Sequence, residues 1–173
     1  MSEKQLELDK RYLRMARIWA ENSYCTRRKV GALIVKDKMI ISDGYNGTPS
    51  GFENEGETVE CSCKWTHGCA YSGESPDKVK SVGYCKGCDY ATLVTKPYVL
   101  HAEANAITKI AKSGNNSDGA TLYVTASPCL ECAKLIIQSG IRRVVYGELY
   151  RITDGIDLLE RAGVEVVYLK LEE

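Results

Sequence analysis

ATLYVTASPCLECAKLIIQSGIRRVVY, residues 120–146, is the stretch of sequence that decides the fold. Its first part, 120–125, is apolar and β-branched, which predicts a strand. Residues 129–139 then have an amphipathic pattern that ends at Gly140, which predicts a helix, and 143–146 predict another strand. Strands that alternate with helices predict a mixed, partly parallel sheet with helices on both faces.

The flanking sequence extends the same pattern in both directions. Apolar residues at helical spacing predict a helix before the first strand, and two short apolar runs around Lys36-Asp37-Lys38 predict a hairpin. The resulting α/β chain has five strands in its sheet. The remaining predicted helices are 6–23, 101–112 and 153–162, and the remaining predicted strands are 30–35, 39–42 and 164–169.

Residues 52–97 interrupt this pattern, because neither helical nor strand periodicity is visible there. The segment holds five of the eight cysteines and one of the two histidines. A structureless loop of this length is improbable in a compact domain unless something clamps it. We therefore predict one domain over 1–173, with a cysteine-rich insertion at about 52–97.

Composition excludes several classes of protein. Lys+Arg and Asp+Glu are both 23, and this zero net charge argues against long nucleic acids as partners. No apolar run is long enough to cross a bilayer, and the N-terminal MSEKQLELDK lacks the apolar core of a signal peptide. We expect a cytoplasmic protein without a membrane partner, in the cytosol of a cell or of an infected host. In that reducing compartment the cysteines are expected to bind metal rather than form disulfides.

Two short motifs carry the candidate chemistry. His101, Ala102 and Glu103 open one predicted helix, and PCLEC (128–132) opens the next. Each motif follows a chain breaker, so we expect its side chains in the first helical turn. The helix dipole favours cysteines there as thiolates, which are the form that binds zinc.

His101, Cys129 and Cys132 are therefore predicted to bind one zinc ion. Three protein ligands leave tetrahedral zinc one open position for water, which is typical of catalytic sites. Zinc lowers the pKa of that water, and a carboxylate beside it must move the proton. Glu103 can reach the water without binding the metal, so we predict that Glu103 is the catalytic proton shuttle. A structural zinc site and a non-catalytic zinc-binding relative are the alternatives.

HAEANA (101–106) together with PCLEC resembles the zinc-dependent cytidine and deoxycytidylate deaminase superfamily, whose motifs are H-x-E and P-C-x-x-C. The predicted order of elements is similar to the three-layer α/β/α fold of that superfamily over nearly the whole chain. Segments 25–32 (CTRRKVGA), 44–47 (GYNG) and 123–129 (YVTASPC) resemble the deoxycytidylate (dCMP) deaminases in particular. The resemblance implies zinc-dependent hydrolysis of dCMP to dUMP and ammonia, which supplies dUMP for thymidylate synthesis.

The resemblance also implies how the substrate is held. Asn46 would bind the sugar and its 3′ hydroxyl, although Asn-Gly is also a common turn pair. Tyr150 matches a family tyrosine near the phosphate, and backbone groups at Ala102 and Ser127 would read the cytosine ring.

Arg27, Arg28 and Lys29 form the densest basic cluster of the chain. Arginine side chains suit phosphate oxygens, and a nucleotide needs such a site where a nucleoside does not. We predict a phosphate contact for Arg27 or Arg28, with a solvated loop as the alternative.

Regulation is expected from the resemblance alone. Deoxycytidylate deaminases of this type form homo-hexamers, which dCTP activates and dTTP inhibits with magnesium, through the Gly-Tyr-Asn-Gly region. Glycine turns expose backbone N–H groups that can cradle phosphates. The candidate effector contacts are Gly44, Gly47 and Gly51, and simple turn geometry explains the same glycines equally well.

The insertion predicts a second, structural zinc ion. Cys85 and Cys88 have C-x-x-C spacing, so one tight turn can supply two thiolates, and Cys63 and Cys69 are our choice for the other ligands. Cys61 or His67 could replace them, since spacing alone does not rank the four. A zinc clip would supply the ordering energy that this polar segment lacks, with free or partly oxidised thiols as the alternative.

Two other functions remain open at this point. The chain could be another deaminase of the superfamily, acting on a nucleoside, a base or a tRNA, or a zinc module without catalysis. The neutral charge and the combination of the GYNG motif with the insertion favour a deoxycytidylate deaminase over the other deaminases of the superfamily.

Overall fold

The computed structural model describes residues 2–61, 83–85, 88–150 and 152–171. Its contacts divide the chain into two compact units. The first unit takes in 1–23, 29–46 and 100–173, and the second takes in 24–28 and 47–99. The predicted insertion falls inside the second unit, and one domain over 1–173 stays a prediction.

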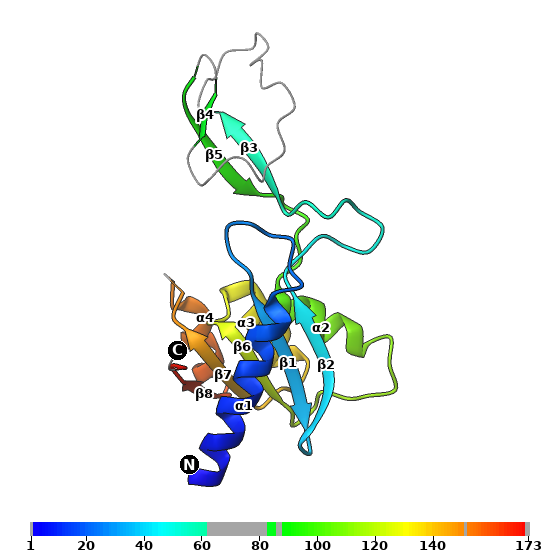
Figure 1. The fold of residues 1–173 in the computed structure, drawn as a ribbon. Coiled ribbons are helices and arrows are strands. Elements are labelled where there is room, and N and C mark those ends of the chain that lie inside the picture. The colour runs from blue at the N-terminus through cyan, green and yellow to red at the C-terminus, as the bar shows by residue number, and fades with distance from the viewer. Residues whose placement is uncertain (1, 62–82, 86–87, 151, 172–173) are drawn as a thin grey trace. The chain divides into compact units, whose positions relative to one another are not determined.

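The first unit contains a five-stranded sheet in the order β2-β1-β6-β7-β8 (Figure 1). The pairs β2/β1 and β1/β6 are antiparallel, whereas β6/β7 and β7/β8 are parallel. The predicted mixed five-stranded sheet is therefore confirmed. The strands are β1 (Gly31–Lys36), β2 (Met39–Tyr45), β6 (Thr121–Ala126), β7 (Arg143–Glu148) and β8 (Glu165–Tyr168).

Helices cover both faces of this sheet, because successive strand residues point to opposite sides. Leu33 and Val145 pack with Ala16 of α1 on one face. Ala32 and Val144 belong to the larger core beneath the other three helices. Figure 1 shows α1 on one face and α2, α3 and α4 on the other, which is the predicted three-layer arrangement. The helices are α1 (Glu3–Ala20), α2 (Ala102–Ile110), α3 (Leu130–Gln138) and α4 (Asp154–Arg161).

No helix in the described parts of the chain has the length and apolar character needed to cross a membrane.

A buried charged network joins α1 to the sheet. The carboxylate of Asp9 is fully buried and accepts two hydrogen bonds from the Arg143 guanidinium, at 2.9 and 2.7 Å. It also accepts hydrogen bonds from the Tyr123 hydroxyl at 2.7 Å and the Gln5 amide at 2.9 Å. Arg143 donates in addition to Glu165 at 3.1 Å. The buried charge is thus paired on both sides, which offsets the cost of its desolvation.

The second unit contains a three-stranded antiparallel sheet in the order β3-β5-β4, with β3 (Glu57–Cys61), β4 (Gly83–Cys85) and β5 (Cys88–Thr95). These three strands contradict the expectation that 52–97 has no strand periodicity. β3 and β4 have five and three residues, which leaves few alternating positions, and the eight residues of β5 (CDYATLVT) do not alternate apolar with polar side chains.

Glu57 fixes the start of this sheet to the segment before β1. Its side chain is only 3% exposed, and its carboxylate accepts hydrogen bonds from the backbone N–H groups of Thr26 and Arg27 at 3.1 and 3.2 Å. Backbone donors aimed at a buried carboxylate satisfy a charge that would otherwise be costly to bury.

A second polar cluster joins the two ends of the insertion. The Lys96 ammonium lies 2.8 Å from a carboxylate oxygen of Glu53, which also accepts a hydrogen bond from the Tyr98 hydroxyl. The Lys96 backbone N–H donates to the Gly56 carbonyl at 2.9 Å. These hydrogen bonds between protein groups therefore hold the two ends of the insertion together without a metal ion.

Candidate active site and metal centre

Three potential metal ligands converge in the first unit. The ligand atoms of His101, Cys129 and Cys132 all lie within 4.8 Å of one another. Nδ1 of His101 is 3.4 Å from the sulfur of each cysteine. Around a tetrahedral zinc ion with ordinary bond lengths, a nitrogen and a sulfur ligand are about 3.5 Å apart. One imidazole and two thiols at this spacing fit a catalytic zinc ion.

Two helix starts place these side chains. His101 is the N-cap of α2, and Cys129 is the N-cap of α3, both with extended backbone. Cys132 follows in the first turn of α3, where it is 2% exposed. An N-cap side chain points back over the helix entrance, so the two helices present their ligands to the same point. The positive ends of both dipoles also favour anionic ligands there.

The electrostatics of the cluster favour one thiolate at Cys129. Hydrogen bonds from Cys132 and then from His101 lower the pKa of Cys129 to about 3. The same hydrogen bond to Cys129 and burial raise the pKa of Cys132, and the hydrogen bond with Cys129 raises the pKa of His101. A dication placed among the three donors would favour both cysteines as thiolates.

Glu103 lies beside the ligands in the first turn of α2. It is 4% exposed, and this burial raises the pKa of its carboxyl group to about 7. A carboxyl group that titrates near neutral pH can both accept and donate a proton, which is what a proton shuttle must do.

The backbone groups beside the ligands are Ala102 and Ser127. Ala102 is the first residue of α2, where the N–H has no acceptor within the helix. Ser127 donates its N–H to the Glu148 carbonyl at 2.8 Å, and its hydroxyl accepts from the Tyr150 N–H at 2.7 Å. Any ligand contact of the Ser127 backbone would therefore use its carbonyl oxygen. The Tyr150 side chain is 42% exposed.

Asn46 is held firmly at the end of β2. Its side-chain oxygen accepts from the Val30 N–H at 2.8 Å, and its N–H donates to the Val30 carbonyl at 3.1 Å. Its carbonyl accepts from the Ser23 hydroxyl at 2.7 Å. The Asn46 carboxamide thus has a fixed orientation within the first unit.

The three glycines of the predicted effector region have different surroundings. A side chain at Gly44 would overlap the Ala102 carbonyl and lie 2.6 Å from the Ala106 nitrogen, so α2 packs directly on β2 there. Gly51 has φ +92° and open space around it, which fits a turn. Gly47 is buried at the start of the second unit.

The basic cluster divides between the two units. Arg27 is exposed and Arg28 is half-buried, and both belong to the second unit. Lys29 belongs to the first unit, where its ammonium donates to the Glu21 carbonyl at 3.1 Å. Lys29 therefore interacts with the C-terminal end of α1.

The candidate ligands of the second zinc ion lie only partly within the described residues. Cys63, His67 and Cys69 fall outside them. Cys85 and Cys88 pair with each other across β4 and β5, and Cys61 pairs with Ala91 across β3 and β5.

Gly155 is a residue that the sequence analysis missed. A side chain there would overlap the Pro128 carbonyl and lie 2.8 Å from the Cys129 carbonyl. The first turn of α4 therefore packs directly against the turn that holds Cys129. A glycine within a predicted first helical turn was the available signal, because glycine is unfavourable inside a helix unless close approach requires it.

Comparison with known proteins identifies the family of the chain. Residues 6–148 match the family model described as the cytidine and deoxycytidylate deaminase zinc-binding region. The chain is 36% identical over 172 residues to the deoxycytidylate deaminase of Enterobacteria phage T4, covering 89% of this chain and 86% of that protein. It is 39% identical over 139 residues to the deoxycytidylate deaminase of Mycobacterium phage D29, covering 80% and 92%.

Among solved structures, the chain is similar to the dCMP deaminase from the cyanophage S-TIM5, crystallised in complex with dCMP and dUMP. The TM-score is 0.70 with 38% identity, and the match covers 98% of this chain and 99% of that chain. With a family match over most of its length and relatives above 30% identity, this chain is a deaminase that belongs to the zinc-binding cytidine and deoxycytidylate deaminase family.

Proposed function

We propose that this chain hydrolyses dCMP to dUMP and ammonia. The observation that carries the proposal is the convergence of two thiols, one imidazole and a buried glutamate at two helix starts. The similarity to the S-TIM5 dCMP deaminase over nearly all of both chains supports dCMP as the substrate. The dUMP that forms would serve thymidylate synthesis in the cytoplasm.

His101, Cys129 and Cys132 hold the catalytic zinc ion in this proposal, since their donor atoms have the spacing of zinc ligands. The zinc ion, when bound, supplies a Lewis acid that brings the pKa of a water molecule toward neutrality. The buried side of the site, with Cys132 at 2% exposure, excludes bulk water and strengthens these interactions.

Glu103 moves the protons. It accepts one from the attacking water, whose oxygen bonds to C4 of the cytosine ring, and passes it to N3. Glu103 then carries the proton of the new C4 hydroxyl group to the exocyclic amine, the C4–N bond breaks, ammonia leaves and the C4 carbonyl of uracil forms. The pKa of about 7 suits a group that must take up and release a proton in each turnover.

Ala102 and Ser127 read the base in this proposal. The Ala102 N–H, unpaired within α2, suits an acceptor such as the cytosine O2. The Ser127 carbonyl suits a donor, and the exocyclic amine of cytosine is one. The Ser127 carbonyl would distinguish cytosine from uracil, because the O2 assigned to Ala102 is common to both bases.

The sugar and the phosphate fall to side chains of the loops. Asn46, whose carboxamide is fixed by Val30, binds the 3′ hydroxyl. Arg27 or Arg28 binds the phosphate, with Tyr150 as a further contact, because a dianion needs cationic or hydroxyl donors. These assignments rest on the family resemblance and on the residue types.

The second zinc ion is part of the proposal. Pairing of Cys85 with Cys88 across β4 and β5 brings their backbones together, as a C-x-x-C metal turn requires. Cys63 and Cys69 complete the set, with Cys61 or His67 as substitutes.

Regulation completes the proposal. We infer a homo-hexamer that dCTP activates and dTTP inhibits, each with magnesium, through Gly44, Gly47 and Gly51. Initial rates at varied dCMP, with and without each triphosphate and magnesium, measure this directly. Hyperbolic kinetics that neither triphosphate changes would contradict the regulation and leave the activity in place.

A substrate panel tests the function itself. The purified zinc-loaded protein is assayed for ammonia release from dCMP, deoxycytidine, cytosine and tRNA. We expect the highest kcat/KM with dCMP. Equal kcat/KM values for dCMP and deoxycytidine would show that the protein makes no productive contact with the phosphate. A higher value with cytosine or tRNA would assign another deaminase of the family, and zinc binding without turnover of any substrate would indicate a non-catalytic relative.

A further inference from the structure

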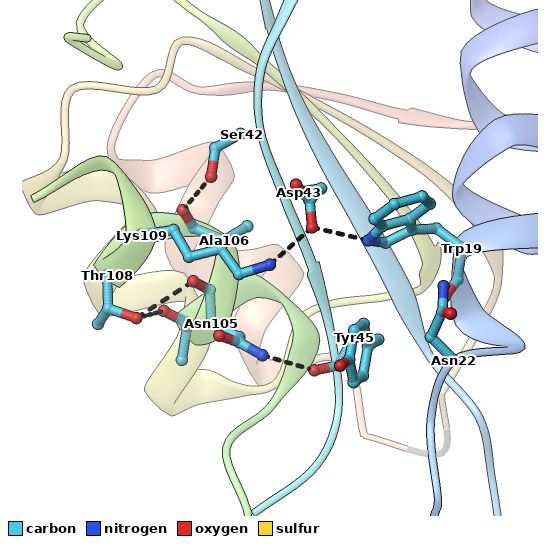
Figure 2. Close-up of polar contacts among 10 residues, drawn as sticks. Trp19, Asn22, Ser42, Asp43, Tyr45, Asn105, Ala106, Thr108 and Lys109 are labelled. Carbon is cyan, nitrogen blue, oxygen red and sulfur yellow. Dashed lines mark hydrogen bonds and ion pairs between the residues drawn. The ribbon is translucent and has the colours of Figure 1, made fainter. Parts of the chain in front are cut away.

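The end of β2 is fastened to α2 by four consecutive residues. The Ser42 hydroxyl donates to the Ala106 carbonyl at 2.7 Å, and the Lys109 ammonium lies 2.6 Å from the Asp43 carboxylate. Gly44 packs against the backbone of α2. The fourth contact, at Tyr45, is made by a side chain of α2 (Figure 2).

That side chain is Asn105. Its amide nitrogen donates to the Tyr45 carbonyl at 3.0 Å, and its backbone N–H donates to the His101 carbonyl at 2.9 Å. Figure 2 shows the amide pointing from α2 toward the last residue of β2. Asn105 therefore donates one hydrogen bond to the backbone carbonyl of the metal ligand His101 and another to the peptide that joins Tyr45 to Asn46.

The other contacts of Asn46 give this bond its importance. Ser23 and Val30 hold Asn46 from the side of α1 and β1. Of the two neighbouring tethers to α2, the Lys109–Asp43 pair lies one helical turn farther from His101. Asn105 is the side chain whose bond reaches the peptide directly before Asn46.

We propose that Asn105 is a positioning residue, which sets the placement of the Asn46 carboxamide relative to His101 and Glu103. This inference rests on the proposed function, because it takes Asn46 as a substrate contact. Asn105 acts through the Tyr45 carbonyl and does not touch the reacting atoms. Its loss leaves the metal ligands on their own helix starts and the bonds of Asn46 to Val30 and Ser23 in place, but it removes the side-chain hydrogen bond that ties the Tyr45–Asn46 peptide to α2.

The test is a double-mutant cycle on kcat/KM for dCMP with the zinc-loaded protein, using Asn105→Ala and Asn46→Ala. A misplacement of about 1 Å can cost as much as roughly 100-fold in rate. We expect Asn105→Ala to lower kcat/KM by roughly 10- to 100-fold, mainly through KM, with zinc content unchanged. In the Asn46→Ala background the same substitution should have less than about a twofold effect, because the group it positions is absent.

Lys109→Met is the matched control, since it removes another α2–β2 tether while keeping the aliphatic chain. It should lower kcat/KM by less than about twofold. Asn105→Gln, which keeps a donor, should recover part of the activity. Equal losses from Asn105→Ala in both backgrounds, or an equal loss in Lys109→Met, would overturn the inference.

Two outcomes separate this inference from the proposed function. If Asn46→Ala alone leaves kcat/KM unchanged while the wild-type protein deaminates dCMP, the inference is wrong and the function stands. If the wild-type protein acts on another substrate of the panel, the proposed function is wrong, and the same cycle with that substrate decides the inference.

Discussion

Glu103 concentrates the chemistry in a single carboxyl group, 4% exposed and two residues from His101. We expect Glu103→Gln to fold and bind zinc but to lose activity by at least about 10²- to 10⁴-fold, because an amide cannot relay the proton. Ammonia release and metal analysis of the same sample measure both effects.

His101→Ala is the companion variant, and it should lose the metal together with the activity. Substantial turnover in Glu103→Gln would show that another group moves the proton. Loss of zinc in that variant would show instead that Glu103 is a ligand.

A substitution at Gly44 distinguishes a packing role of this residue from a role in effector binding. Alanine there would collide with the backbone of α2 at Ala102 and Ala106. Overpacking of this kind costs about 1–3 kcal/mol, so Gly44→Ala should lower the free energy of unfolding and the basal activity together. Urea unfolding curves and effector-free kinetics measure the two.

Gly114→Ala is the control, because a side chain there would meet open space. It should be neutral or slightly stabilising. If Gly44→Ala changed only the response to triphosphates, Gly44 would be an effector contact rather than a packing position.

At the scale of elements, the Asp9 network decides how α1 is attached. Burial raises the pKa of Asp9, but hydrogen bonds from Arg143, Tyr123 and Gln5 outweigh it, and the net pKa is lowered. A carboxyl group with a lowered pKa stabilises the fold above its unfolded pKa of about 3.9, and this contribution is lost as the pH falls through the folded value.

Asp9→Asn should therefore destabilise the protein by about 3 kcal/mol between pH 5 and 8, since it leaves the Arg143 charge without its partner. The difference from wild type should shrink below about pH 4, where Asp9 of the unfolded chain begins to be protonated, and vanish once the pH falls through the lowered pKa of the folded protein. Urea unfolding at a series of pH values measures this. Glu7→Gln, in an exposed pair with Lys10 on the same helix, should change stability little at any pH. A difference for Asp9→Asn that does not vary with pH would contradict the assignment.

At the scale of the whole molecule, the open question is the number of metal ions. We expect two zinc ions per chain, falling to one in Cys85→Ser/Cys88→Ser, because that variant removes two thiolates of a four-ligand site. Elemental analysis of the purified protein gives the count, and limited proteolysis should cleave the variant faster than the wild-type protein.

The two ends of the insertion should stay ordered in that variant, since the contacts of Glu57 and the Lys96–Glu53 pair need no metal ion. One zinc ion in the wild-type protein, lost only on changing His101 or Cys129, would show that the cysteines of the insertion have no structural zinc.

The sequence by itself determined the elements of the first unit and the donor set of the site. The strand–helix–strand pattern of 120–146 predicted the sheet, and helix-initial HAE and PCxxC indicated a zinc deaminase. These inferences succeed because periodicity, capping and ligand spacing are properties of residues close together in the chain.

Only the tertiary structure decided what joins those elements. Asp9 and Arg143 are 134 residues apart, and nothing local to either predicts their pairing. The bond from Asn105 to Tyr45, the packing of Gly44 on α2 and the sheet of β3, β5 and β4 belong to the same class. Contacts between residues far apart in the chain depend on how the faces of helices and sheets pack. The local sequence could therefore predict only a turn at Gly44 and a helical position at Asn105.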